Sequence, residues 1–463
     1  MAFPRYFWLL TVALVAAGLL MAVAWVPAGP AERPNVVIIF LDDAGWADFS
    51  PFDRSVTYTP NAQELAAAGV TFSNFYVPQG VCSASRAALL TGCYPGRTGV
   101  HGAFPPRRAG LDRKFATMAE VFSAGGYRTA IFGKWHLGDT DGTRPWDRGF
   151  DESAGLLYSA DMWKNHPEDP EYWGRFPLQF FENGEVLIDD VGDAEQRTLT
   201  RRYTDYATDF IRRNRETPFF LYVPHNQPHV PLFVGEEFAG KTGMGLYADV
   251  IGELDWSIGQ IKEELATQGL LENTIFIVSS DNGPWLSYGN HAGVTPFREG
   301  KTTSWDGGVK TGMLFSYPEL TAGGRHLDNV VFSIDLLPTL CDLTGVALPA
   351  ADIDGKSFTS LLTGENGFLN KQPYYAVSNL GELQAIISSD GRFKLHAAHD
   401  YKTMATAGKD GMPGTYRRDS IGPVLYDLRA DPFERFDVKN NHPKVYQELL
   451  QRYQTHLAKF YKN

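Results

Sequence analysis

Residues 35–43 read NVVIIFLDD, an asparagine followed by an unbroken apolar run that stops at two aspartates. Such a continuous apolar run is typical of a strand buried on both faces of a parallel sheet. Asp42 and Asp43 therefore follow directly on the carboxyl end of a predicted core strand. This pattern indicates the α/β class and places two carboxylates where open sheets of this class bind their ligands.

Three further predicted core strands also end in side chains that can bind ions or transfer protons. Segments with helical spacing, such as residues 247–265, separate these strands. Because the carboxyl ends of parallel strands face one crevice, we expect the clusters to converge on a single site. The strands and the residues after them are 126–133 with Lys134 and His136, 219–223 with His225 and His229, and 274–278 with Asp281 and Asn282.

Asp42, Asp43 and Asp281 would repel one another if brought together, by about 4 kcal/mol per pair at about 4 Å and an effective dielectric constant of about 20. Protonation or a bound cation relieves that repulsion. With Asn282 the aspartates form an all-oxygen set, which suits Ca²⁺ or Mg²⁺ more than zinc. Taken alone, either pair could also be a turn or a helix cap.

The run 81–92 reads VCSASRAALLTG and contains one of the three cysteines of the chain. Ser85 is predicted to cap a helix that ends near Gly92, which would put Cys82 just before a helix N-terminus. That position favours negative charge, and Arg86 would add its fixed positive charge. A half-buried free cysteine is the alternative for a lone thiol.

Lys134, His136, His229 and Lys301 supply the positive charge and the proton-transfer groups that an anionic substrate requires. Lysine binds a tetrahedral oxyanion as a point charge, and histidine can protonate a leaving alkoxide. Taken singly, such residues are more often structural or solvent-exposed. Weaker candidates for the same roles are His101, His225 and His291.

The 463-residue chain carries a formal net charge of −12. Phosphate backbones select basic surfaces, so we expect no nucleic-acid partner. An apolar run over residues 7–26 is nearer the ~20 residues of a membrane span than the ~7–15 of a signal-peptide core. We therefore expect export to the periplasm or the cell exterior, with residues 1–31 as a signal peptide or an N-terminal membrane anchor. The other two cysteines, Cys93 and Cys341, could pair or stay free.

The length predicts a large domain followed by a smaller one. Strands and helices alternate to about residue 345, whereas short predicted strands and one last helix follow Pro373. We therefore expect a catalytic domain over residues 32–370. An α+β subdomain, an antiparallel sheet plus a helix, is expected over residues 371–463.

Taken together, these motifs resemble the type I sulfatases of the alkaline phosphatase superfamily, and the arylsulfatase A-like branch most of all. The Cys82 run is the specific match, with Ala84 in place of the usual proline. The resemblance implies an alkaline phosphatase-like fold, in which a large, mixed and mostly parallel sheet is flanked by helices. The other matching stretches are 35–45, 126–138, 228–231, 280–284, 300–308 and 425–434.

The resemblance also implies a sulfuric ester hydrolase that acts on sulfate monoesters. A formylglycine-generating maturation enzyme would oxidise Cys82, and the hydrate of the resulting formylglycine would be the nucleophile. One Ca²⁺ per chain would be bound by residue 82 together with Asp42, Asp43, Asp281 and Asn282.

The remaining roles also follow from the resemblance. Lys134, His229 and Lys301 would hold the sulfate, with His229 or Lys301 protonating the leaving oxygen. Arg86 and His136 would hold the formylglycine hydroxyls, and His136 would act as the base.

Two alternatives remain open. A phosphomonoester or phosphonate hydrolase of the same superfamily is one, although no histidine cluster of the two-zinc kind accompanies Asp281. A binding protein without turnover is the other, should Cys82 not be matured. Aromatic residues in three predicted pocket loops, 104–110, 158–173 and 285–294, suit a sulfated glycan, a steroid or a small aryl ester equally well.

Overall fold

The computed structural model describes residues 33–321, 323–364 and 372–461. The predicted leader over residues 1–31, with its apolar run 7–26, lies outside the described residues. Within the described ranges no helix is both long and apolar enough to cross a membrane. The predicted domain boundary at residues 370 and 371 also lies outside them.

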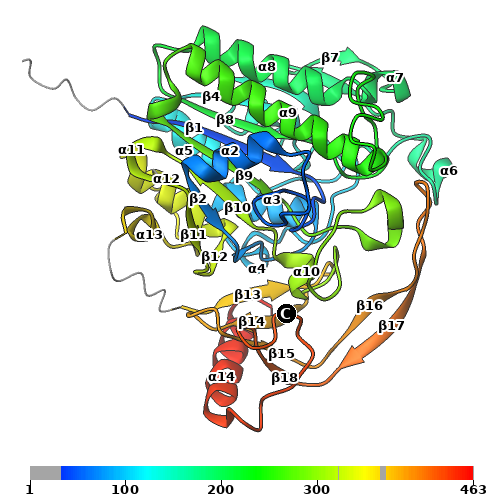
Figure 1. Cartoon of the computed structure of the whole chain (residues 1–463), viewed down its shortest axis with the longest axis vertical. Helices are drawn as coiled ribbons and strands as arrows, with labels where there is room; N and C mark the ends of the chain where they lie inside the picture. The colour runs from blue at the N-terminus through cyan, green and yellow to red at the C-terminus, as the bar shows by residue number, and fades with distance from the viewer. Residues whose placement is uncertain (1–32, 322, 365–371, 462–463) are drawn as a thin grey trace, which may run out of the picture. The chain divides into compact units, whose positions relative to one another are not determined.

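The predicted strand after Asn35 is the centre of the fold. This strand, β1 (Asn35–Leu41), is buried along its whole length and pairs in parallel with β8 (Phe219–Pro224) and β9 (Thr274–Ser280). Antiparallel strands extend the sheet on both sides, so it is mixed, as predicted (Figure 1). Within the described residues its order is β11 (Arg325–Leu327), β2 (Val70–Phe72), β10 (Met313–Ser316), β9, β1, β8, β4 (Arg128–Lys134), β5 (Glu152–Leu156), β6 (Phe180–Glu182) and β7 (Glu185–Ile188).

Helices cover both faces of this sheet. In β8, Phe219 contacts Phe210 of α8 (Leu199–Arg213), and the next residue, Phe220, stacks on Phe122 of α5 (Met118–Ala124). Successive residues of a strand point to opposite faces, so α8 and α5 lie on opposite sides of the sheet. The long helix α9 (Leu246–Thr267) packs on α8 and on α2 (Pro60–Ala68), while α3 (Cys82–Thr91) packs on α5 and on α12 (Leu336–Thr344).

The C-terminal region forms a second, antiparallel sheet. Its strands β13 (Tyr374–Val377), β14 (Leu383–Ile387), β15 (Phe393–His396) and β18 (Val424–Asp427) pack against α14 (Pro443–Phe460). Figure 1 shows this sheet and α14 in orange and red, and the ribbon formed by β16 (His399–Thr406) and β17 (Thr415–Ile421) extends from it. A C-terminal α+β subdomain is therefore present, as predicted, but the ribbon was not predicted.

Short elements complete the described chain. The two-stranded sheet β3 (Phe75–Tyr76) and β12 (Val331–Phe332) lies apart from the main sheet. The short helices are α4 (Pro95–Thr98), η1 (Pro145–Asp147), α6 (Pro170–Trp173), α7 (Asp193–Gln196), η2 (Leu271–Asn273), η3 (Leu286–His291), α10 (Asp306–Val309), α11 (Pro318–Thr321), η4 (Ser333–Asp335) and α13 (Thr359–Thr363).

A buried charge network joins the C-terminal sheet to the segment that carries Lys301. Lys394 of β15 lies 2.7 Å from Asp306 and 2.9 Å from Glu434, and all three side chains are buried. Glu434 also accepts the Asp306 backbone N–H at 2.8 Å. Removing one partner of a buried pair leaves an uncompensated charge, so this junction fixes the path of the chain after Lys301.

Candidate active site

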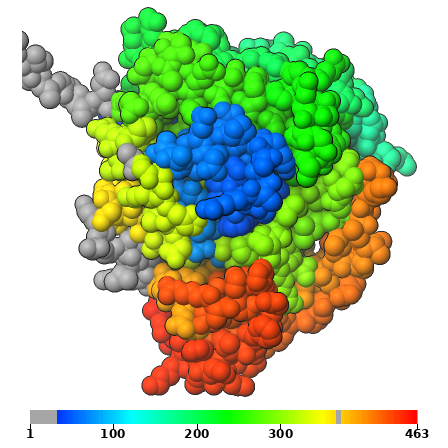
Figure 2. Space-filling view, in the orientation of Figure 1, coloured from blue at the N-terminus to red at the C-terminus, as the bar shows by residue number. Residues whose placement is uncertain are grey.

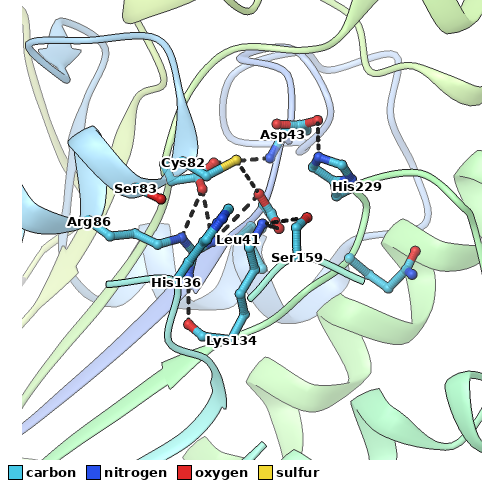
Figure 3. Close-up of polar contacts among 12 residues, drawn as sticks. Leu41, Asp43, Cys82, Ser83, Arg86, Lys134, His136, Ser159 and His229 are labelled. Carbon is cyan, nitrogen blue, oxygen red and sulfur yellow. Dashed lines mark hydrogen bonds and ion pairs between the residues drawn. The ribbon is translucent and has the colours of Figure 1, made fainter. Parts of the chain in front are cut away.

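The carboxyl ends of β1 and β9 bring the predicted carboxylates together. Leu41 is in register with Ser280, so Asp42 and Asp281 leave neighbouring strands at the same level. The Asp43 N–H donates to Asp281 Oδ1 at 3.1 Å, and Asp43 itself has φ of 68°, in the left-handed region. Figure 3 shows Asp43, Cys82 and His229 gathered at this point.

Cys82 is the first residue of α3, so the prediction that Ser85 caps this helix was wrong. The N-cap residue is Val81, and Ser85 lies inside the helix, where its hydroxyl has no partner among the described residues. A backbone contact replaces the missing cap, since the Ala84 N–H donates to Gly102 O at 3.2 Å. A proline at position 84 could not make that hydrogen bond.

The Cys82 thiol is buried and donates to Asp42 Oδ1 at 3.3 Å. Burial raises the pKa of this thiol well above its usual value, and the Asp42 carboxylate raises it further, against the opposing charges of Lys134 and Lys301. A thiolate is therefore disfavoured at this position, which weakens the hypothesis of a reactive cysteine.

Arg86 connects α3 to the ends of three strands, because it contacts Asp281 after β9, Lys134 of β4 and, through Nη2 at 3.6 Å, Asp42 after β1. Its Nε and Nη2 donate to Asp281 Oδ2 at 3.1 and 2.8 Å, and its Nη1 donates to the Lys134 carbonyl at 3.0 Å. The Lys134 ammonium in turn forms an ion pair with Asp42 and donates to Ser159 Oγ at 3.0 Å. The fork of Arg86 suits this role because it offers several donors in a fixed plane.

The carboxyl groups of Asp42 and Asp281 respond to this environment in opposite ways. Burial raises the pKa of Asp42, but Lys134, His229, Arg86 and other cations outweigh it and hold this pKa well below its usual value. Burial and the neighbouring Asp42 raise the pKa of Asp281 to about 7, although Arg86 lowers it. Two buried carboxyl groups thus lie close enough for one to raise the pKa of the other, and a bound divalent cation would favour the charged form of both.

Asp43 lies beside Lys301 and His229. Lys301 Nζ is 2.7 Å from Asp43 Oδ1 and 4.3 Å from the centre of the Trp285 ring. The His229 Nδ1 is 2.5 Å from the Val230 carbonyl, so Nδ1 carries a proton, and Nε2 is 3.6 Å from Asp43 Oδ2. Both the lysine and the histidine therefore present their polar ends to the same carboxylate.

The residues at this centre fit a hard cation. Ligand atoms of Asp42, Asp43, Cys82 and His229 all lie within 4.8 Å of one another. Asn282 donates to Asp43 Oδ1 at 2.7 Å, and its own Oδ1 is buried without a partner among the described residues. A buried amide oxygen beside two carboxylates is a donor set that Ca²⁺ accepts.

His136 follows β4 in the left-handed region, with φ of 59°. Its Nε2 lies 3.0 Å from the Phe104 carbonyl and so carries the ring proton, whereas Nδ1 is buried and has no partner in the described part of the chain. Burial lowers the pKa of His136 well below its usual value, and Lys134 and Arg86 lower it further. The ring is therefore neutral, with Nδ1 able to accept a proton.

Comparisons with known proteins agree with this geometry. A model of the sulfatase family matches residues 34–346, and a model of the C-terminal region of N-sulphoglucosamine sulphohydrolase matches residues 300–463. Human arylsulfatase A is 34% identical over 452 residues, which cover 91% of this chain and 87% of that protein. The chain belongs to the sulfatase family.

Other relatives of this sulfatase extend the comparison. Mouse N-acetylgalactosamine-6-sulfatase is 32% identical over 94% of the chain and 87% of its own length. The crystal structure of the PsFucS1 sulfatase from Pseudoalteromonas sp. superimposes with a TM-score of 0.83, at 24% identity, and covers 98% of this chain and 95% of that one. The predicted family, fold class and enzyme class, a sulfuric ester hydrolase, are all confirmed.

Two polar residues at this centre were not predicted. Ser159 accepts a hydrogen bond from Lys134. The Asp161 carboxyl is buried, which raises its pKa, but the nearby charges of His229 and Lys134 help to hold this pKa below its usual value. Both residues lie on the loop after β5, within the predicted pocket wall 158–173. No periodicity or motif in the sequence identifies these two residues, because they reach the centre on an irregular loop.

The three weaker histidine candidates lie elsewhere in this sulfatase. His225 is buried against Ser257 at 3.2 Å, and burial lowers its pKa to about 3, so it is a structural residue. His291 lies near Asp410 at the end of the β16–β17 ribbon, and His101 lies beside the Tyr461 ring at 6.4 Å. None of the three joins the group of metal-ligand atoms found among the described residues.

Proposed function

We propose that this sulfatase hydrolyses sulfate monoesters at the Cys82 cluster, after conversion of Cys82 to formylglycine and with one Ca²⁺ per chain. The observation that carries the proposal is the position of Cys82, whose buried thiol lies 3.3 Å from Asp42 Oδ1 at the start of α3. A protonated thiol beside a carboxylate is a poor nucleophile. A cysteine kept at the centre of this cluster is better explained as the precursor of another group.

The four residues after β1 and β9 would hold Ca²⁺ together with residue 82. The support for this assignment is the convergence of Asp42, Asp43 and Asp281 and the unpartnered Oδ1 of Asn282. When present, Ca²⁺ supplies positive charge at a sulfate oxygen, and formylglycine supplies a hydrated aldehyde whose hydroxyl can attack sulfur.

Lys134 and Lys301 would bind the sulfate oxygens from two sides of the centre. Both side chains are buried, so their charges act in a medium of low dielectric constant. His229 Nε2 faces Asp43, and in the imidazolium form, with protons on both ring nitrogens, it would protonate the leaving oxygen and keep the proton on Nδ1, a contribution of about 10²–10⁴ in rate. The Trp285 ring lies 5.5 Å from the His229 ring, in an edge-to-face arrangement.

Arg86 and His136 would serve the other side of residue 82. Arg86 holds α3 against Asp281 through two hydrogen bonds and would orient the hydroxyls of the matured residue. The Nδ1 of His136 would accept a proton from one of these hydroxyls, because its Nε2 is already committed to the Phe104 carbonyl.

Peptide mass spectrometry and turnover together test this proposal. Protein from the native host should yield a Cys82 peptide that carries an aldehyde and reacts with a hydrazide, and should hydrolyse an aryl sulfate in a Ca²⁺-dependent manner. A free thiol in every molecule of an active preparation would overturn the maturation step. Faster hydrolysis of the matching phosphate or phosphonate ester would instead favour the alternative activity.

We further propose that the substrate is a sulfated glycan or a small sulfate ester. Relatives named N-acetylgalactosamine-6-sulfatase and steryl-sulfatase, both from mouse, are 32% and 30% identical to this chain, and support both kinds of compound. One solved structure at 26% identity, with a TM-score of 0.78, comes from work on glycosaminoglycan metabolism in Bacteroides thetaiotaomicron.

The proposal also includes export and maturation by a formylglycine-generating enzyme. Residues 1–31 would direct the chain out of the cytoplasm or anchor it to the membrane through residues 7–26, as their apolar composition indicates. Fractionation of the native host, followed by N-terminal sequencing, tests this part. Recovery of the full chain from the cytoplasm alone would contradict it.

A further inference from the structure

We propose that Trp285 is a positioning residue of the catalytic centre and that Tyr416, on the β16–β17 ribbon, fixes the orientation of its indole ring. Trp285 would hold the Lys301 ammonium and the His229 imidazole beside Asp43, where the leaving oxygen of the ester would lie. The inference rests on the proposed function, in which Lys301 binds the sulfate and His229 protonates that oxygen.

The indole of Trp285 contacts both of these side chains. Lys301 Nζ lies over the ring, 4.3 Å from its centre, within the ~6 Å over which an aromatic face attracts a cation. The His229 ring meets the same indole at 5.5 Å, with an interplanar angle of 65°. Both polar side chains are buried, so water screens these contacts little. Trp285 therefore adds a second contact to a flexible lysine side chain whose ion-pair partner is Asp43.

The backbone keeps Trp285 next to Lys301. The Lys301 N–H donates to the carbonyl of Pro284, the residue before Trp285, at 2.9 Å. A Cβ added at Gly300 would lie 2.5 Å from that carbonyl oxygen, so this close approach of two main chains requires glycine. The two segments are thus fixed relative to each other, and side-chain contacts are left to set the rotation of the indole.

Two tyrosines set that rotation. The Trp285 Nε1–H donates to Tyr416 Oη at 2.9 Å, and the Tyr288 ring meets the indole edge to face at 4.9 Å. An indole has a single N–H donor, so an acceptor placed at that atom selects one orientation of the ring. Because Trp285 is only partly buried, close packing alone does not fix its orientation.

The ribbon that carries Tyr416 is attached to the segment that carries Trp285. Figure 2 shows the ribbon in orange at the surface, along one side of the molecule, and β17 is exposed along most of its length. Its tip nevertheless docks on η3 through the backbone, because the N–H groups of Gly408 and Gly414 donate to Ser287 O at 2.8 and 2.7 Å. The C-terminal subdomain thereby contacts the catalytic centre through the hydrogen bond between Trp285 and Tyr416.

Leaving-group dependence in the matured, full-length enzyme tests the role of Trp285. Phenyl sulfate and 4-nitrophenyl sulfate carry the same sulfate group, but phenolate is the more basic leaving group and depends more on protonation. Trp285→Leu should lower kcat/KM about 30-fold for phenyl sulfate and about threefold for 4-nitrophenyl sulfate, a part of the ~10²–10⁴ that general-acid catalysis contributes. Equal losses for the two esters would overturn the inference, because damage to sulfate binding or to the fold affects both alike.

Two further variants define the contact. Trp256→Leu is the matched control, since Trp256 of α9 carries Arg201 over its ring at 4.5 Å and neither residue belongs to the candidate site. It should leave the ratio of the two kcat/KM values unchanged. Trp285→Phe should give a ratio between those of wild type and Trp285→Leu, because phenylalanine keeps an aromatic face for Lys301. A ratio equal to that of Trp285→Leu would overturn the contact between ring and cation.

Tyr416→Phe tests the ribbon contact with little risk to the fold, because it removes one hydroxyl from an exposed strand. It should lower kcat/KM about threefold more for phenyl sulfate than for 4-nitrophenyl sulfate, the usual effect of one neutral hydrogen bond. In the Trp285→Phe background, which has no indole N–H, Tyr416→Phe should change neither value. Equal effects in both backgrounds would overturn the role of Tyr416.

Nuclear magnetic resonance of the full-length Cys82→Ala chain, labelled with ¹³C at the lysine ε-carbons, separates this inference from the proposed function. Protons above an aromatic ring resonate upfield, so the Lys301 signal, identified by its loss in Lys301→Arg, should move downfield in Trp285→Leu. A Lys301 signal that does not move would overturn the inference, with or without turnover. A matured wild type that cleaves no sulfate ester would overturn the proposed function, and this signal would then decide the contact by itself.

Discussion

Arg86 is the residue on which the geometry of the centre depends most directly. It is fully buried and gives its donors to Asp281 and to the Lys134 carbonyl. Arg86→Met should lower the free energy of unfolding by about 3–5 kcal/mol, because it leaves the Asp281 carboxylate unpaired in the interior. Arg86→Lys keeps the charge but loses the fork, so we expect an intermediate loss, read from urea unfolding midpoints.

A surface arginine gives the matched control for this prediction. Arg213 pairs with Glu152 and Asp209, but its side chain is 48% exposed. Arg213→Met should cost at most about 1 kcal/mol, the usual range for exposed ion pairs. Comparable losses in Arg86→Met and Arg213→Met would contradict the role given to Arg86.

The two nitrogens of His136 lead to a second prediction. Glutamine at position 136 can still donate to the Phe104 carbonyl but cannot accept a proton as imidazole does. His136→Gln should therefore reduce kcat about 10²–10⁴-fold while KM for an aryl sulfate stays nearly constant. His225→Gln, at another buried histidine, should keep kcat nearly unchanged. A change in KM without loss of kcat would assign His136 to substrate binding instead.

The same residues show what a sequence can predict at this scale. Asp42 and Asp281 end apolar runs whose strands are parallel neighbours, so sheet geometry alone predicts that they meet. Ser159 and Asp161 reach the centre on a loop, and the path of a loop depends on tertiary contacts that leave no period in the sequence. The cap at Ser85 was wrong because a backbone carbonyl, at Gly102, takes over the role of a capping side chain.

At the scale of elements, the junction between β15 and α10 positions the segment that carries Lys301. Lys394→Met would remove the ammonium group that pairs directly with both buried carboxylates, Asp306 and Glu434. We expect a loss of about 3–5 kcal/mol in unfolding free energy. We also expect a higher KM for sulfate esters, because Asp306 follows Lys301 closely in the chain.

A double variant checks this assignment. Adding Glu434→Gln to Lys394→Met neutralises one of the two carboxylates, so the double variant should be more stable than the sum of the single losses predicts. Lys439→Met, at a partly exposed lysine paired with Asp437, should change stability by less than about 1 kcal/mol. Strict additivity of the two changes would contradict a shared buried network.

His456 makes the docking of α14 sensitive to acid. The His456 ring stacks on Tyr375 at 3.5 Å and meets the Tyr94 ring edge to face. Burial lowers the pKa of His456 to about 4. The charge of Asp354 opposes this shift, whereas Lys459 and Arg97 add to it. In the unfolded chain the pKa is about 6.5, so the unfolded state binds more protons between pH 4 and pH 6.5.

The contribution of neutral His456 to the free energy of unfolding is therefore fully present above about pH 6.5 and is lost as the pH falls toward 4. Between pH 7 and pH 5 the loss is about 2 kcal/mol. His456→Gln should flatten that part of the pH dependence, measured by urea unfolding at both values. His326→Gln, at an exposed histidine, should keep the wild-type slope. An unchanged slope in His456→Gln would exclude His456 as the source.

Elements differ in how far the sequence predicted them. The buried strands β1, β8 and β9 are continuous apolar runs, and α9 has a clear apolar face, so all four were predicted. The ribbon β16–β17 was not, because β17 is exposed along most of its length and carries no alternation of buried and exposed residues.

At the scale of the whole molecule, the candidate metal site joins parts of the chain that are far apart in sequence. Asp42 and Asp43 follow β1, Asp281 and Asn282 follow β9, and Cys82 begins α3. An unfolded chain cannot hold these groups together, so a cation that binds them binds the folded state. Ligand binding of this kind raises the stability of the entire catalytic region, rather than of one element.

Calcium should therefore raise the melting temperature of the metal-free protein. At a Ca²⁺ concentration of about 100 times Kd, the gain is about 2.7 kcal/mol, or roughly 3–5 °C for a chain of this size. Asp43→Asn should abolish the shift because it removes a carboxylate ligand, whereas Asp53→Asn, at an aspartate with no place in the centre, should keep it. An equal shift in Asp43→Asn and wild type would place calcium at another site. The predicted site takes ligands from the ends of β1 and β9 and from α3, so its calcium affinity depends on the folded arrangement of all three and on the Asp43 carboxylate.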